Sequence, residues 1–74
     1  MPCLKQIQGI KVEMYFNDHL PPHVHVLYNE FEELIEIETF RTYVGEVPPK
    51  QRKLAVTWME AHQDFLRNKW EEFH

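Results

Sequence analysis

Residues 10–16 read Ile10-Lys11-Val12-Glu13-Met14-Tyr15-Phe16 and alternate between apolar and mostly polar side chains. Successive side chains of a strand point to opposite faces, so this alternation predicts a half-buried β-strand with its apolar residues on one face. Pro21 and Pro22 lack backbone donors and favour an extended or turned chain, so we expect the strand to end before them. The run 10–16 therefore defines the two faces of a sheet.

Three more strands are predicted after the prolines, at about 23–28, 33–39 and 41–44. The strands at 23–28 and 33–39 are close enough in sequence to form a hairpin through Asn29-Glu30 or a slightly longer loop. The last strand is short and ends at Gly45.

The remainder of the chain predicts a helix. Pro48 and Pro49 suit its first turn, and no Gly or Pro occurs from Lys50 to Phe73, so we predict one long helix over 49–73. Its apolar residues fall within one half of a helical wheel. The expected fold class is α+β: a small, mainly antiparallel sheet of three to four strands with one long C-terminal helix on one face, forming a single domain over 1–74.

The length of 74 residues raises a question of stability, because one small core rarely stabilises such a chain without further support. Cys3 is the only cysteine, which excludes an intramolecular disulfide and any cysteine-rich zinc site. A metal or a partner subunit remains as the expected support. No stretch resembles a signal peptide or a membrane span, so we expect a cytoplasmic protein.

The net charge of −4 is concentrated in residues 29–46, where six glutamates accompany one cation, Arg41. Nucleic-acid binding depends on a basic surface, so the acidic middle of the chain argues against a nucleic-acid partner. A basic protein partner fits this segment better. A solvated hairpin face rich in glutamate would give the same pattern.

His23 and His25 share one face of their predicted strand, and the apolar residues between and after them share the other. We therefore expect the two histidines on the outer, solvent face of the sheet, which Glu13 shares. A two-residue loop would pair His23 with Glu36 and His25 with Leu34, whereas a four-residue loop would pair the histidines with Glu38 and Glu36. Either register places a histidine opposite a glutamate.

A His-x-His pair beside a carboxylate suits a divalent transition metal such as zinc, iron or nickel. The candidate ligands are His23, His25, Asp18, His19 and Glu36. Two other interpretations remain open: the cross-strand pairs are purely structural, or His19, His23 or His25 performs acid–base catalysis. His62, at the centre of the helical apolar stripe, is expected to be a buried histidine on the other side of the sheet.

The predicted helix is longer than the sheet, at about 36 Å against about 23 Å for a seven-residue strand. Its last turns should therefore extend beyond the sheet. Lys69 interrupts the apolar stripe there, yet Trp70 and Phe73 are large and apolar. We expect these three residues to contact a small protein partner or a second copy of the chain. The alternative is that Trp70 folds back over the sheet edge.

The run from Asn17 to Val26 resembles the DHxPPHxHV signature of a small bacterial family catalogued as a domain of unknown function, number 4160. The resemblance extends to the strand ending in Tyr-Phe, the acidic hairpin and the helical pattern Trp58, His62, Leu66, Trp70. A turn glycine usual in the family is replaced around Phe40. Any function of the family would rest on the signature positions Asp18, His19, Pro22, His23 and His25.

Members of this family resemble, in size and gene arrangement, the proteins of toxin–antitoxin-type pairs. The leading hypothesis is therefore an interaction module of a two-protein system. One alternative is a small ribonuclease-like effector that uses the histidines, with Lys50, Arg52 and Lys53 as its only cation cluster. The other alternative is a metal-binding domain built on the His-x-His strand.

Overall fold

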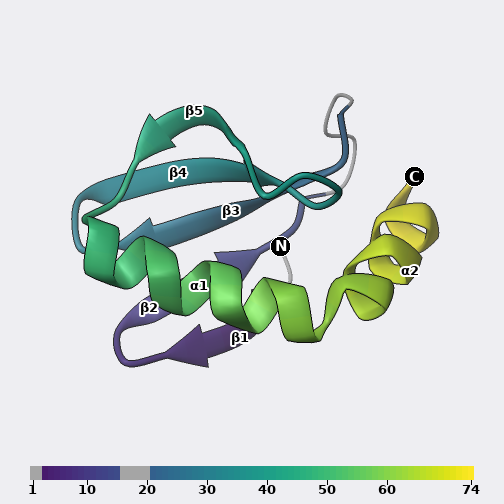
Figure 1. Cartoon of the computed structure of the whole chain (residues 1–74). Coiled ribbons are helices and arrows are strands. Elements are labelled where there is room, and N and C mark those ends of the chain that lie inside the picture. Colours follow the sequence, from purple (N-terminus) through teal and green to yellow (C-terminus); the bar gives the residue numbers. More distant parts are fainter. Residues whose placement is uncertain (1–2, 16–20) are drawn as a thin grey trace.

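The computed structural model describes residues 3–15 and 21–74, which form five strands followed by two helices (Figure 1). The elements are β1 (Cys3–Ile7), β2 (Ile10–Glu13), β3 (His23–Tyr28), β4 (Phe31–Glu36), β5 (Thr42–Glu46), α1 (Pro49–Ala61) and α2 (Gln63–Phe73). The strands form one antiparallel sheet in the order β1-β2-β3-β4-β5. The predicted α+β class with an antiparallel sheet is confirmed.

The prediction of three to four strands is too low, because it omitted β1. Residues 3–7 show no clean alternation of apolar and polar side chains, so the strand gives a weak sequence signal. Its pairing depends on the turn that follows. Gln8 and Gly9 both have positive φ, 46° and 83°, as a type I′ hairpin turn requires, and Ile7 pairs directly with Ile10.

Two of the predicted strand ranges were displaced along the sequence. β3 covers the predicted 23–28, but β4 lies at Phe31–Glu36 instead of 33–39, and β5 at Thr42–Glu46 instead of 41–44. The two-residue turn at Asn29-Glu30 lets β4 begin at once, with Asn29 at φ 52°. The first predicted strand is also shorter, since β2 is Ile10–Glu13 and Phe16 lies outside the described residues.

The turn after β4 explains why the strand ends early. The amide of Phe40 donates to the carbonyl oxygen of Glu36 at 3.0 Å, and the amide of Glu36 donates to the carbonyl oxygen of Arg41 at 2.9 Å. Phe40 adopts a φ of 61°, a left-handed conformation that a bulky residue rarely takes. The Phe40 side chain packs against the core, which compensates for the backbone conformation.

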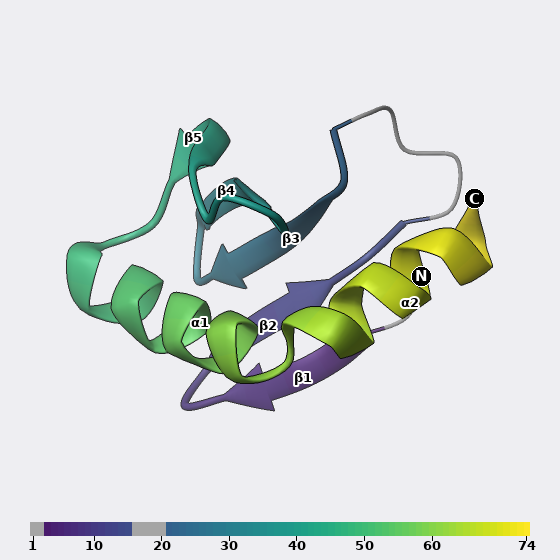
Figure 2. The same ribbon diagram turned by 45° about the vertical axis from the view of Figure 1, so that its right-hand side comes forward.

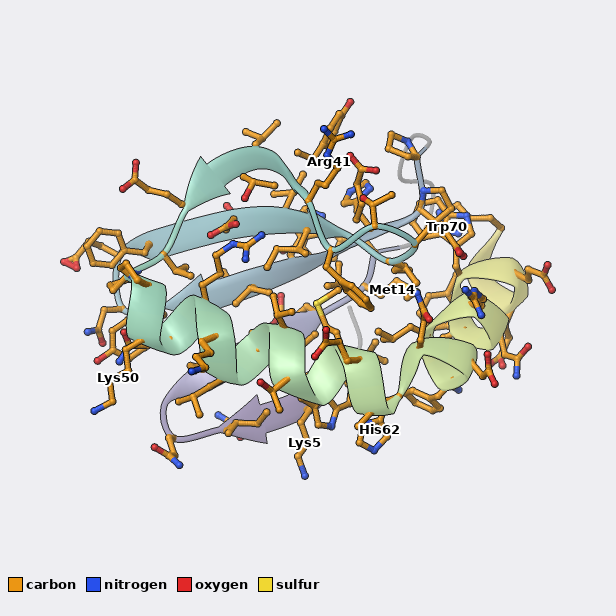
Figure 3. The ribbon with its side chains drawn as sticks, in the orientation of Figure 1. Lys5, Met14, Arg41, Lys50, His62 and Trp70 are labelled. Carbon is orange, nitrogen blue, oxygen red and sulfur yellow. The ribbon has the colours of Figure 1, made fainter. Side chains whose placement is uncertain are left out.

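The core lies between the sheet and the helices, on the face that we call the inner face. Ile10, Val12 and Met14 are fully buried there, as the alternation in residues 10–16 predicts. Figure 2 shows both helices on this side of the sheet, and Figure 3 shows Met14 between the sheet and α1. The buried apolar residues are Ile10, Val12, Met14, Val24, Val26, Ile35, Ile37, Val47, Ala55, Met59, Leu66 and Trp70.

The inner face also contains one buried carboxylate, which no sequence argument anticipated. Glu33 is 1% exposed and accepts hydrogen bonds from the Val47 amide at 3.0 Å, from Arg52 Nε at 2.8 Å and from the Thr42 hydroxyl. Arg52 also donates to the carbonyl oxygen of Phe40 at 2.8 Å. A buried carboxylate is tolerated only with such partners. The network therefore fixes β5 and the start of α1 against β4.

The single helix predicted over 49–73 is wrong, because the chain breaks at His62, where φ is −128° and ψ is 29°. No Gly or Pro causes the break. The Gln63 side chain donates from Nε2 to the carbonyl oxygen of Ile37 at 2.9 Å, which ties the start of α2 to the end of the sheet. The bend returns Leu66 and Trp70 to the core, so the last turns do not continue the line of one straight helix as predicted.

Both helices end in the same local arrangement. His62 follows Trp58 by four residues and His74 follows Trp70 by four residues, and each histidine is the C-cap of its helix. In each pair the histidine Nδ1 donates to the tryptophan carbonyl oxygen, at 2.9 Å and 2.8 Å, and the two rings stack. The last carbonyl groups of a helix lack partners within it, so this arrangement satisfies one of them.

β5 is an edge strand with an irregular backbone, and all of its residues are exposed. Its register with β4 shifts between Leu34 and Ile35, because Tyr43 is an extra residue of β5 that forms a bulge. Gly45 has a φ of 80°, and a Cβ atom there would collide with the carbonyl oxygen of Glu32. Only glycine suits this close approach of β5 to β4.

Candidate functional site

The site predicted on β3 is buried within the molecule. His23 and His25 lie on the outer face by register, because Val24 and Val26 point to the core, but their exposed fractions are only 2% and 7%. The expectation that both histidines face solvent is therefore wrong. The two-residue loop sets the register that pairs His23 with Glu36 and His25 with Leu34, one of the two predicted alternatives, and Glu13 pairs with His25 from β2.

Aromatic rings account for much of the burial of the two histidines. Tyr15 stacks on His25, with ring centroids 4.0 Å apart, and His25 lies 5.3 Å from His23. The His23 ring lies 5.6 Å from Tyr43 of β5 and 5.5 Å from Trp70 of α2. The signature histidines thus lie between the segment that follows β2, the edge strand β5 and the last helix.

Each of these histidines donates a hydrogen bond from Nδ1. His23 Nδ1 lies 2.7 Å from the carbonyl oxygen of Pro21, and His25 Nδ1 lies 2.9 Å from a carboxylate oxygen of Glu32. Carbonyl and carboxylate oxygens only accept, so the proton is on Nδ1 in both rings. Glu32 is the carboxylate partner of His25, and Glu36 accepts from the Thr39 hydroxyl instead.

The predicted metal ligands are only partly brought together. Asp18 and His19 lie outside the described residues. Over residues 3–15 and 21–74, no group of three or more His, Cys, Asp or Glu side chains is placed to hold a metal ion. His23 and His25 are adjacent, but Glu36 does not complete a set with them.

Two other predicted features have different surroundings from those expected. His62 is exposed at the helix break and points away from the sheet (Figure 3), so the expectation of a buried histidine is wrong. Of the three cations at the start of α1, Arg52 is held by Glu33. Lys50 and Lys53 are exposed.

The predicted partner interface at the end of α2 is divided between core and surface. Trp70 is 6% exposed and packs inside the chain, whereas Phe73 is half-buried. Lys69 pairs with Glu72 at 3.4 Å and lies over the ring of Phe65. The burial of Trp70 leaves a smaller apolar surface at this end than the sequence suggested.

A different surface offers apolar and charged side chains together: the outer face of the sheet over β3, β4 and β5. Leu27 and Leu34 are half-buried and Val44 is 55% exposed, and the register places them on a diagonal across three neighbouring strands. We call these three residues the outer apolar stripe. Both helices lie on the inner side of the sheet (Figure 2), and the contact of Trp70 of α2 with the outward His23 is at the start of β3, away from the stripe.

Carboxylates surround the outer apolar stripe. By register, four glutamates and one lysine lie on this face: Glu13, Glu32, Glu36, Glu46 and Lys11. The charge pattern of the sequence predicts an acidic segment but does not by itself point to the apolar residues among its carboxylates. The signal was present, because Leu27, Leu34 and Val44 each share the parity of an outward glutamate or histidine.

Comparisons with known proteins agree with the resemblance noted in the sequence. A model of the family described as "Domain of unknown function (DUF4160)" matches residues 9–71. Searches of curated proteins and of solved structures give no significant match. Among the described residues, neither helix is long and apolar enough to cross a membrane.

Proposed function

This chain belongs to the DUF4160 family, and we propose that it is a protein-interaction module of a two-protein, toxin–antitoxin-like system. The observation that carries the proposal is the outer apolar stripe. Leu27, Leu34 and Val44 are adjacent on a sheet face that neither helix covers. Adjacent apolar residues rimmed by polar ones are typical of a protein-binding surface.

The outer face is a better candidate than the end of α2. Trp70 already packs against His23 and His74, so it has little surface left for a partner. Val44 is more exposed than any other large apolar residue identified at the surface. The interface at Lys69 and Phe73 stays a prediction that the same experiment tests.

Site-specific photo-cross-linking in the native cell tests the proposal. A photoreactive amino acid replaces Val44 in one variant, Phe73 in a second and Thr57, an exposed residue of α1, in a matched control. We expect a cross-link to one other protein from Val44 and none from Thr57. No adduct from Val44, or the same adducts from Thr57, would overturn the proposal. An adduct of twice the chain's own mass would show self-association and contradict the two-protein system.

A metal-binding function is a second candidate, because of the geometry of the two signature histidines. Metal-binding histidines usually donate their other ring N–H to a carboxylate or carbonyl oxygen, as His23 and His25 do from Nδ1. Two imidazoles on one tetrahedral zinc ion have ring centroids about 5 Å apart, and those of His23 and His25 are 5.3 Å apart. Further ligands would have to come from elsewhere.

Calorimetric titration of the untagged protein with zinc alone tests this second candidate. We expect binding to be lost in His23→Gln and in His25→Gln and kept in the matched controls His62→Gln and His74→Gln. Circular dichroism establishes that each variant is folded. Absence of zinc binding by the wild-type protein, or equal losses in all four variants, would refute the metal site.

A further inference from the structure

The outer apolar stripe has a definite shape, which restricts what could cover it. Leu34 and Val44 are direct partners across β4 and β5, and Leu27 lies diagonally opposite Leu34 on β3. Neighbouring strands are about 4.8 Å apart, so the stripe is about 10 Å wide. This is the width of one α-helix with its side chains.

The charge around the stripe restricts the occupant further. Glu32 and Glu46 are direct partners across β4 and β5, and like charges directly opposite each other repel. His25 contacts Glu32, but among the described residues no lysine or arginine forms an ion pair with either carboxylate. A cation brought by a partner would relieve this repulsion.

We infer that the outer face receives a basic amphipathic helix of the partner protein, which completes a third layer on the sheet. This inference rests on the proposed function and adds the chemistry of the partner. The apolar side of the helix covers Leu27, Leu34 and Val44, and its lysines or arginines contact Glu32 and Glu46. α1 already covers the inner face, so the complex has a helix on each side of the sheet.

The charge pattern favours this occupant over a second copy of the chain. A second copy would bring the same acidic face or its own acidic hairpin to the interface, and like charges would then meet. A partner strand added to β5 is also disfavoured, because the bulge at Tyr43 and the left-handed Gly45 interrupt the straight edge that such pairing needs.

Titration with model peptides, followed by amide NMR signals, tests the inference. The probe is a 14-residue peptide of leucine and lysine with its leucines at helical spacing, and the matched control peptide has glutamate in place of lysine. We expect the leucine–lysine peptide to shift the amide signals of Leu27, Leu34 and Val44, and the leucine–glutamate peptide to leave them unchanged. Equal effects of both peptides, or shifts confined to the helices, would overturn the inference.

Matched charge variants establish where the lysines bind. Glu32→Gln with Glu46→Gln removes the two facing carboxylates, and the glutamine at position 32 still offers an oxygen to His25. We expect this double variant to weaken binding about fivefold to tenfold. The control, Glu60→Gln with Glu71→Gln, makes the same charge change on exposed helix positions and should alter affinity less than twofold. Equal weakening by both pairs would show attraction to net charge alone.

The two experiments fail in different ways. If Val44 cross-links to a partner in the cell but the leucine–lysine peptide does not bind the outer face, the interaction module stands and the basic helix is wrong. If Val44 cross-links to nothing, the proposed function fails whatever the peptide does.

Discussion

Two pairs of histidines in this small fold share their local chemistry but differ in what they connect. His23 and His25 on β3, and His62 and His74 at the helix ends, each donate from Nδ1 to an oxygen and lie against an aromatic ring. The strand pair is buried and joins residues from β4, β5 and α2. The helix-end pair is exposed, and each ring donates to the tryptophan carbonyl oxygen four residues back.

The difference shows that histidines with the same hydrogen bond and ring stacking can contribute differently to the free energy of unfolding, depending on their burial. On β3, removing a histidine ring would leave a cavity, because the surrounding side chains cannot easily close in to fill it. At a helix end, water replaces the lost bond and stacking partner. We therefore expect the strand pair to affect global stability and the helix-end pair to affect only the last turn of each helix.

Trp70→Ala should have the largest effect, because Trp70 contacts one member of each pair, His23 and His74. Truncation of a buried tryptophan should cost about 3–5 kcal/mol of unfolding free energy. Trp58→Ala is the matched control, since Trp58 makes the same contacts with His62 but is only half-buried. Urea unfolding followed by far-UV circular dichroism measures both, and equal losses would contradict the role of burial.

His25→Ala should rank next, with a loss of about 2–3 kcal/mol. The variant removes the ring that stacks on Tyr15 and the hydrogen bond to Glu32. His25→Phe keeps a stacking ring and loses only the bond, so it should cost about half as much. The same urea measurement applies, and a cost of under 0.5 kcal/mol, on the scale of a neutral surface substitution, for His25→Ala would argue against a structural role of the signature strand.

His62→Ala and His74→Ala should each cost only about 0.5–1 kcal/mol, the range of one exposed cap. The two rings bond to the carbonyl oxygens of different tryptophans in different helices, so the double variant should show additive losses. Helix content from circular dichroism at low temperature gives a second readout. A loss as large as that of His25→Ala would erase the proposed difference between the two pairs.

Acidification should have the smallest effect, through an exposed ion pair that joins α2 to the turn after β4. Arg67 donates two hydrogen bonds to Glu38, at 2.7 Å and 2.8 Å, and these bonds lower the pKa of the Glu38 carboxyl group. A lowered folded-state pKa gives stability that is present above the unfolded-state pKa, near 4.5, and is lost as the pH falls through the lower folded value.

Comparison with Glu38→Gln isolates this contribution. Unfolding free energy measured from pH 7 to pH 3 should fall less steeply for the variant, because glutamine does not titrate. Since both side chains are exposed, the stability that the ion pair contributes should be smaller than the stability lost in His62→Ala. Parallel curves for the two proteins would show that the ion pair does not stabilise the fold.

The inner face was predictable because alternation alone determines it. Ile10, Val12 and Met14 are buried as the period-two pattern requires, and the His23–Glu36 register follows from a two-residue loop. The strand at Cys3–Ile7 and the break at His62 were not predictable in this way. Both depend on contacts made elsewhere: a pairing with β2 in one case and the bond from Gln63 to Ile37 in the other.

The candidate site was likewise only partly predictable from the sequence. Sequence parity placed His23 and His25 on the outer face, but it could not show that rings from Tyr15, Tyr43 and Trp70 would bury them. The buried Glu33 was not anticipated, although it shares the parity of the inward-facing Ile35. Its burial depends on Arg52, which pairs with it from the start of α1.

The irregular backbone of β5 has a consequence for how this protein behaves at high concentration. Open strands at the side of a sheet are where copies of a chain stack into fibrils, because aligned amide and carbonyl groups accept another strand. In β5 the bulge at Tyr43 and the left-handed Gly45 turn these groups out of line. The strand can thus remain exposed without serving as a template for polymerisation, and the neighbouring sheet face stays accessible to a partner.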